Sequence, residues 1–325
     1  MNLRIPPLSK TCRAAKPGTM AVLLFVLVLL LLSGCSKLSS NNAITPTREN
    51  ICTDNGGLRV SFLDNMPPKQ IFEGDQFYIG VMLKNDGCFP ISEGYVTLGG
   101  YDADVTSISS GDRQKILYDL EGKTVYTPEG GRAEMIFEAK NKKIRFKIPE
   151  ATETFSVNTC YTYQTIATAQ VCINPNRPDV MGMRNDVCEA GKIILDQKQG
   201  SPVIVDSVKS TTVRSGDRIE VNFDIKVKNI GKGHVRDYAD GTCQGNASVS
   251  LSEVSFSDRS TENEGKATIT CVPSKIALST NDEKNLFRCK ATFSDSFAAF
   301  TSLLVMRLDY AYTQTTDKTI LIKKI

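Results

Sequence analysis

Apolar and polar residues alternate along much of the chain beyond residue 55. Residues Val221–Val227 and Ile144–Ile148 change character at every step, as a β-strand with one buried face does. Leu58–Leu63 and Phe77–Leu83 are further apolar runs of strand length. Residues 296–308 are apolar enough for a helix, but their β-branched content and the Tyr-x-Tyr that follows favour a strand. The pattern predicts an all-β fold.

Two stretches of the chain repeat the same order of landmarks. Residues 72–87 and residues 213–231 both read Gly-Asp, then an alternating strand, then Lys-Asn-x-Gly. Later in each half a Tyr-x-Tyr follows, Tyr161-Thr-Tyr163 in the first and Tyr310-Ala-Tyr312 in the second, and each is succeeded by one more strand-like run. Two landmarks in the same order at similar separation indicate an internal duplication into two related modules.

Each landmark has a physical reading. Gly in the Gly-Asp pair suits a tight turn with positive φ, and Asp can hydrogen-bond nearby backbone. Asn and Gly of Lys-Asn-x-Gly are expected to supply left-handed conformations for the next turn. The two tyrosines of each pair are expected to lie on one face of a strand. A Tyr near a late strand resembles the tyrosine corner of immunoglobulin-like sandwiches. Several short strands separated by such turns predict a β-sandwich in each module.

The predicted organisation has five parts. They are a signal peptide or signal anchor (1–34), a flexible tether (35–55), a first β-sandwich domain (56–175), a connector (176–200) and a second β-sandwich domain (201–325).

The Gly-Asp, alternating strand and Lys-Asn-x-Gly series resembles the CARDB and APHP group of immunoglobulin-like modules, which occur in tandem on archaeal and bacterial surface proteins. Residues Ser201–Lys209 fit an opening strand of such a module. The resemblance covers residues 56–175 and 201–325. It implies two tandem immunoglobulin-like domains that serve extracellular adhesion, spacing or assembly, and it carries over no catalytic residue.

The N-terminus has the layout of a secretory signal. Thirteen apolar residues run from Met20 to Leu32, after a segment with basic residues and no acidic ones. Such a stretch is short for a transmembrane helix, although extension to about Cys35 keeps that alternative open. The positive flank predicts that the rest of the chain lies outside the cytoplasm.

Leu32-Ser-Gly-Cys35 resembles the lipobox of membrane lipoproteins, in which the cysteine becomes the lipidated first residue. The Ser- and Asn-rich residues 36–42 then resemble a lipoprotein tether. The alternative is an uncleaved signal anchor in which Cys35 is incidental. Either reading predicts a body that is tethered to a membrane and faces the extracellular or periplasmic side.

The net charge and the cysteine content narrow the class of protein further. Four basic and no acidic residues precede Cys35, so the formal net charge of +3 becomes about −1 for the rest of the chain, which argues against nucleic-acid binding. Apart from Cys12 and Cys35, an even set of cysteines remains, as in a disulfide-stabilised exported protein. They are Cys52, Cys88, Cys160, Cys172, Cys188, Cys243, Cys271 and Cys289.

The spacing of these cysteines favours particular pairs. Close neighbours in sequence are expected to join adjacent strands, and the odd numbers in the two halves leave one bridge to connect them. The expected pairs are Cys160 with Cys172, Cys271 with Cys289, and Cys188 with Cys243. Other connectivities remain open, and no Cys-x-x-Cys pair indicates zinc or redox chemistry.

Few residues suggest chemistry. His234 is the only histidine and has no evident partner, so an exposed loop residue is expected. Asp102-Ala-Asp104 resembles part of a calcium site but lacks the fuller ligand series, which favours ordinary turn acids. Asn246-Ala-Ser248 is an N-glycosylation sequon. Because no nucleophile or phosphate-binding motif occurs, we expect no catalytic site, metal or cofactor.

The function expected from the sequence is that of a membrane-anchored extracellular structural or adhesion protein, whose two disulfide-stabilised domains contact other surface proteins. The alternative is a surface lipoprotein that captures a small molecule or a glycan. The absence of Trp weakens a sugar-binding reading, although the tyrosine pairs could provide stacking platforms. A large pocket with converging polar groups would favour the alternative.

Overall fold

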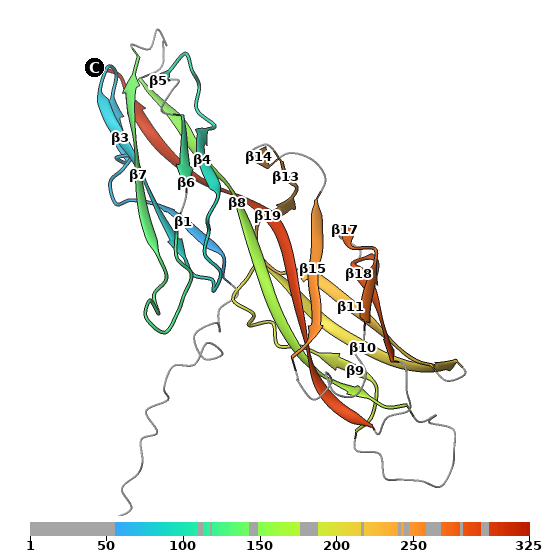
Figure 1. Cartoon of the computed structure of the whole chain (residues 1–325). Coiled ribbons are helices and arrows are strands. Elements are labelled where there is room, and N and C mark those ends of the chain that lie inside the picture. Colours follow the sequence, from blue (N-terminus) through green and yellow to red (C-terminus); the bar gives the residue numbers. More distant parts are fainter. Residues whose placement is uncertain are drawn as a thin grey trace, which may run out of the picture. The chain divides into compact units, whose positions relative to one another are not determined.

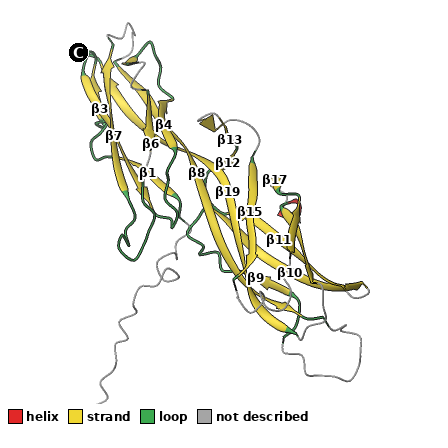
Figure 2. Cartoon of the chain, in the orientation of Figure 1, coloured by secondary structure: helices red, strands yellow, loops and turns green. Residues whose placement is uncertain are grey.

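The computed structural model describes residues 56–325, apart from residues 110–112, 118, 143–148, 176–187, 216–217, 240–241, 244–246, 258–267, 280–281 and 294–298. Within these ranges the chain is all-β, as the alternation predicts, and η3 is a short 3-10 helix near β18 (Figure 2). No helix of the described part is both long and apolar enough to cross a bilayer. The predicted anchor, Cys12, Cys35, Cys52, Asn246 and the expected strand at 144–148 lie outside the described residues.

The elements follow one another in this order: β1 (Leu58–Phe62), β2 (Gln70–Phe72), β3 (Gln76–Asn85), β4 (Gly94–Gly99), β5 (Thr106–Ile108), β6 (Gln114–Leu117), β7 (Arg132–Asn141), β8 (Glu150–Ile173), β9 (Lys192–Ile194), β10 (Val203–Ser215), β11 (Arg218–Asn229), β12 (His234–Arg236), β13 (Tyr238–Ala239), β14 (Thr242–Cys243), β15 (Ser248–Phe256), β16 (Thr268–Val272), β17 (Lys275–Ala277), η3 (Asp282–Lys284), β18 (Leu286–Phe293) and β19 (Phe300–Lys323).

The strands form three main sheets. A four-stranded sheet has the order β1-β3-β7-β5, and a five-stranded sheet has the order β16-β18-β11-β10-β9. The largest, an eight-stranded sheet, has the order β17-β15-β19-β8-β4-β6, and β2 and β12 also pair with β19. Among the described pairings all are antiparallel except that of β19 with β2. β13 and β14 form a separate hairpin.

Two very long strands connect the halves of the chain. β8 and β19 each have 24 residues and pair along their whole length, from Glu150 opposite Lys323 to Ile173 opposite Phe300. β8 pairs with β4 only through residue 161, and β19 pairs with β15 only through residue 310. Each strand therefore begins beside strands of its own half of the sequence and ends in the other half, as the green and red strands of Figure 1 show.

The length of these strands follows from their sequences. Neither contains a Gly or Pro, and in β8 the odd-numbered residues from Phe155 to Ile173 are buried along one face. At one end this face packs on the four-stranded sheet, with the rings of Phe77 and Phe155 5.8 Å apart. On β15, which belongs to the eight-stranded sheet together with β8, the ring of Phe256 lies 6.0 Å from the ring of Phe223 of the five-stranded sheet. One hydrophobic core thus runs through both halves.

The disulfides correct two of the expected pairs. Cys271–Cys289 joins directly opposed residues of β16 and β18, as predicted. Cys160 instead bonds Cys243, and Cys172 bonds Cys188. Cys160 and Cys172 cannot bond each other because they lie on one extended strand, where twelve residues span about 40 Å. Of the three disulfides between described residues, one connects the two halves, but its N-terminal cysteine is Cys160. These disulfides indicate an oxidising, extracytoplasmic location.

Candidate functional site

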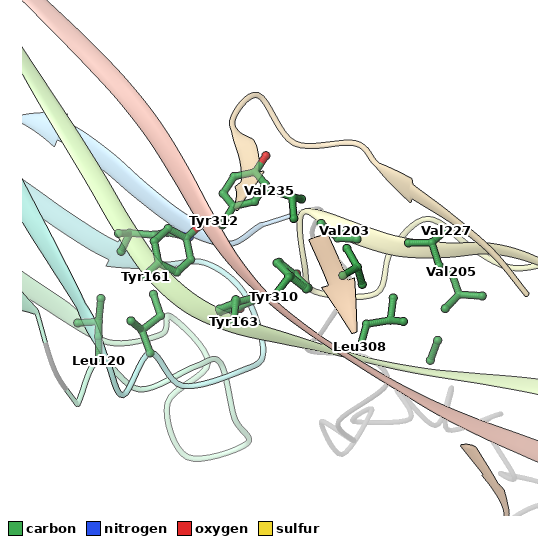
Figure 3. Close-up of a cluster of buried hydrophobic side chains, with 14 of the residues drawn as sticks. Leu120, Tyr161, Tyr163, Val203, Val205, Val227, Val235, Leu308, Tyr310 and Tyr312 are labelled. Atoms are coloured by element: carbon green, nitrogen blue, oxygen red, sulfur yellow. The ribbon is translucent and has the colours of Figure 1, made fainter. Parts of the chain in front are cut away.

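The two tyrosine pairs meet where β8 and β19 pass from one half to the other. Tyr161 lies opposite Tyr312 and Tyr163 lies opposite Tyr310 in the strand register. Their ring centroids are 6.0 Å and 6.2 Å apart, respectively, and Figure 3 shows the four side chains gathered along the two strands. We call these four residues the tyrosine cluster. The cluster brings together the equivalent tyrosines of the two repeats, since Tyr310 and Tyr312 follow Tyr161 and Tyr163 by 149 positions each.

In the N-terminal half (residues 56–175), Tyr163 fastens the Lys-Asn-x-Gly turn. Its hydroxyl accepts a hydrogen bond from Phe89 N at 3.3 Å and lies 3.4 Å from Asn85 Oδ1. Asn85 in turn accepts from Gly87 N and donates to Phe89 O. Tyr161 accepts from Leu58 N of β1 at 3.1 Å. The shared strand β8 therefore holds both ends of the β1–β3 region.

The C-terminal half (residues 201–325) repeats this arrangement atom for atom. The hydroxyl of Tyr312 accepts from Gly233 N at 2.8 Å and donates to Asn229 Oδ1 at 3.2 Å. Asn229 accepts from Gly231 N and donates to Gly233 O. The repeated landmarks of the sequence are thus two copies of one hydrogen-bonded unit, a tyrosine that caps an asparagine-braced turn.

The glycines of these turns serve a different purpose from the expected one. Neither Gly87 nor Gly231 has positive φ, whereas Gly74 of the Gly-Asp pair does, at 88°. A Cβ on Gly87 would lie 1.9 Å from the Tyr163 hydroxyl, and a Cβ on Gly231 would lie 2.2 Å from the Tyr312 hydroxyl. The prediction of left-handed turns is therefore wrong at these positions, and close approach of the tyrosine is what requires glycine.

The tyrosine cluster is structural. The exposed fraction of its members is at most 6%, so they offer no stacking platform for a sugar. Burial raises the pKa of all four phenols above the ordinary value, and the hydroxyls stay protonated and able to donate at physiological pH.

Removing one of these hydroxyls should lower stability without changing the fold. Tyr163→Phe and Tyr312→Phe are each expected to lower the free energy of unfolding by about 1–3 kcal/mol, because the backbone N–H of Phe89 or Gly233 loses its acceptor and the asparagine Oδ1 loses one of its donors. Urea unfolding of the purified protein measures this. Tyr78→Phe is the control, since Tyr78 is 53% exposed. If all three substitutions change the free energy of unfolding equally, the hydrogen bonds from the tyrosine hydroxyls to the two turns contribute nothing to stability.

A groove of about 660 Å³ lies beside the second part of β8. Its lining comprises residues 164 and 166–170, residues 193–196 and 198–200, and Cys88 and Phe89. Two sheet edges therefore border this groove. No described strand pairs with the outer edge of β8 beyond residue 162, and β9 is the last strand of its sheet. Ile194 of β9 is 74% exposed.

The edge of β8 in this groove carries no charge. Residues 164–171 read Gln-Thr-Ile-Ala-Thr-Ala-Gln-Val, whereas the equivalent residues of β19, 313–320, include Asp317 and Lys318. Edge strands that must not pair with other chains usually carry charged side chains. The two long strands differ in this respect, and of these two stretches only residues 164–171 of β8 are suited to accept another strand.

A second, smaller hollow of about 340 Å³ lies close to the tyrosine cluster. We call it the polar pocket, because hydroxyl, amide, carboxylate and ammonium side chains form much of its lining. They are Ser92, Thr162, Gln164, Asp237, Ser248, Ser250, Lys275 and Asp309, and Phe89, Pro90, Tyr163, Tyr310 and Ala311 complete it. Phe89 and Gln164 also line the groove, so the two hollows adjoin.

The remaining candidates from the sequence do not form a site. His234 is exposed, but it lies on β12 rather than in a loop. Asp102 accepts from Asp104 N, as a turn acid does. Glu153 is buried beside them and accepts from Asp102 N and from the Thr106 hydroxyl, and its burial raises its pKa. Among the described residues no group of three or more His, Cys, Asp or Glu is arranged to hold a metal.

Comparison with known proteins adds little. No protein-family model and no curated protein matches the chain. Among solved structures, the sporulation control protein Spo0M from Bacillus subtilis is 10% identical, with a TM-score of 0.15, over 53% of this chain and 80% of that one. A BuGH86 variant in complex with neoagarooctaose is 9% identical, with a TM-score of 0.10, over 79% of this chain and 34% of that one. Escherichia coli alpha-2-macroglobulin, activated by porcine elastase, is 10% identical, with a TM-score of 0.11, over 83% of this chain and 33% of that one. The chain spans about a third of the length of the latter two. At these TM-scores none of the likenesses bears on fold or function.

Proposed function

We propose that this protein is a membrane-anchored extracellular structural or adhesion protein that binds a protein partner by strand addition at the free edge of β8. In this proposal the chain consists of two immunoglobulin-like sandwiches of the CARDB and APHP kind behind a lipid anchor at Cys35 or a signal anchor. Its role is to hold partner proteins at the cell surface, without chemistry of its own.

The single observation that carries the proposal is the open, uncharged edge of residues 164–171 beside the groove. An edge strand presents unpaired N–H and C=O groups, which an extended segment of another protein can pair with. The groove beside it offers apolar surface, including Ile194 and the partly buried Leu195, for side chains of the added strand. Backbone pairing would supply affinity and the groove would supply selectivity.

The interlocked strands support a mechanical role. A partner bound to β8 pulls on a strand that is paired with β19 over 24 residues and fastened by Cys160–Cys243 and Cys172–Cys188. Force applied at the edge therefore passes into both halves of the molecule instead of peeling one strand away. A protein that tethers other proteins to a surface needs this property.

The proposal is tested by placing one charge on the edge. Thr168→Lys is expected to reduce retention of the surface partner from the native envelope by about tenfold or more, because a lysine must be desolvated when a strand is added. Retention is quantified by mass spectrometry on immobilised protein. Thr315→Lys is the matched control, since Thr315 is an exposed threonine in the equivalent stretch of β19, residues 313–320.

The melting temperatures of both variants should match that of the unchanged protein. Equal retention by the unchanged protein and both variants would show that the edge of β8 is not the binding surface.

A further inference from the structure

The polar pocket contains a row of polar residues laid across four strands of the large sheet. Lys275 of β17 lies opposite Ser250 of β15, Ser250 lies opposite Asp309 of β19, and Asp309 lies opposite Gln164 of β8. Cross-strand neighbours in register share one face of a sheet. This face is the reverse of the one that carries Leu308 and Tyr310 into the core.

Two acceptors in this row lack donors. Asp309 Oδ1 and Gln164 Oε1 are both buried from solvent and have no hydrogen-bond partner in the described part of the chain. Their residues are directly opposed in the register and both line the polar pocket, so a donor that enters the pocket lies next to both side chains. Buried acceptors without partners are unfavourable, so a bound donor at this place stabilises the site.

The charge balance of the polar pocket indicates that the donor group is positively charged. Asp237 is already neutralised by Lys275, whose Nζ is 2.6 Å from Asp237 Oδ1, and it also accepts from the Ser248 hydroxyl. On the same strand as Asp309, Arg307 pairs with Glu253 at 3.5 Å. Asp309 forms no ion pair with any described residue, so its carboxylate is left as the uncompensated charge of the pocket lining.

We infer that the polar pocket binds a primary ammonium group on an aliphatic chain, such as the end of a lysine side chain. An ammonium has three donors and no acceptor, and it is positively charged. It therefore matches the two oxygens without partners, one of which belongs to the uncompensated carboxylate of Asp309. Ser250 and Thr162 offer a third acceptor, and Phe89 and Pro90 form an apolar wall for the stem. Calcium does not fit, since it takes six to eight oxygens, commonly from several carboxylates. This inference goes beyond the proposed function and holds whether or not a strand adds to β8.

The test is an NMR titration of the full chain in its oxidised form with small probes. Lysine capped as its N-acetyl and N-methylamide derivative is expected to bind with millimolar affinity and to shift the backbone signals of Gln164 and Asp309. Norleucine with the same caps lacks the ammonium and should bind at least tenfold more weakly. If capped norleucine binds equally well, or if methyl mannoside binds and capped lysine does not, the inference is overturned.

A matched pair of variants assigns the binding to the polar pocket. Asp309→Asn keeps the shape of the side chain but removes its charge, and it should weaken capped lysine by about tenfold or more. Asp317→Asn makes the same change on the same strand, outside the pocket lining, and should leave the affinity unchanged. Equal affinity of both variants would contradict the site.

A third probe distinguishes the two sources of such an ammonium. n-Butylamine has a similar stem without a peptide part. Equal affinities for n-butylamine and capped lysine would assign the pocket to free amines, and tighter binding of capped lysine would assign it to a lysine of a bound protein. Failure of the Thr168→Lys test together with success of this titration would remove the proposed function and leave the ammonium site intact.

Discussion

A chain that ends after Thr313 should lose the folded structure of its N-terminal half, although every other strand of that half is present. The missing residues 314–323 are the part of β19 that pairs with β8 from Glu150 to Thr159. They include Ile320 and Ile322, which are 2% and 1% exposed. Loss of a buried isoleucine costs about 2–5 kcal/mol, so the two together approach the whole stability of an ordinary domain.

Hydrogen–deuterium exchange measures the effect of this truncation. Amides of β3 and β7 are expected to exchange at least a hundredfold faster than in the full chain, while those of β10 and β11 change much less. A chain that ends after Lys323 is the control, since it lacks only two exposed residues. A peptide of residues 314–325 added in trans should restore protection. Unchanged exchange in β3 and β7 would mean that the shared strand does not stabilise the N-terminal half.

The double substitution Cys160→Ser with Cys243→Ser should cost more stability than loss of either other described bridge. This disulfide closes a loop of 83 residues, and restricting the unfolded chain to that extent is worth about 4.5 kcal/mol in the chain-entropy model. Urea unfolding of the purified double variant measures the loss. Removing both cysteines together avoids leaving a free thiol at the junction.

The matched control is Cys271→Ser with Cys289→Ser, whose separation of 18 residues corresponds to about 3 kcal/mol in the same model. The difference between the two double variants isolates the loop length from the loss of a sulfur–sulfur bond as such. A smaller loss for Cys160–Cys243 than for Cys271–Cys289 would contradict the prediction.

Much of the local structure was readable from the sequence. The alternation at Val221–Val227 and Phe77–Leu83 predicts β11 and β3 because a half-buried strand exposes every second side chain. Gly74 and Asp75 predict their turn, since Gly74 has positive φ and Asp75 accepts from Phe72 N. The shared length of β8 and β19 also leaves a signal in the sequence, the absence of Gly and Pro over 24 residues. The order of a Tyr-x-Tyr and a further run nevertheless predicts two strands where the structure has one.

The groove and the polar pocket could not be predicted in the same way. Gln164 and Asp309 are unremarkable polar residues of two strands, and 145 positions separate them in the sequence. Only the register of β8 with β19 places them opposite each other. Nor does local spacing indicate that Cys160 and Cys243 are neighbours, because the path of β8 into the other half decides which cysteines meet.

The sequence alone determined that the chain forms strands, that its two halves repeat one tyrosine, asparagine and glycine unit, and that its cysteines suit an oxidising compartment. These properties follow from side-chain period, turn chemistry and composition, which act over a few residues. The tertiary structure decided that the halves exchange strands, which cysteines bond, and which polar groups share a pocket. Those outcomes depend on burying one continuous core, and that free energy is set by contacts between residues far apart in the chain.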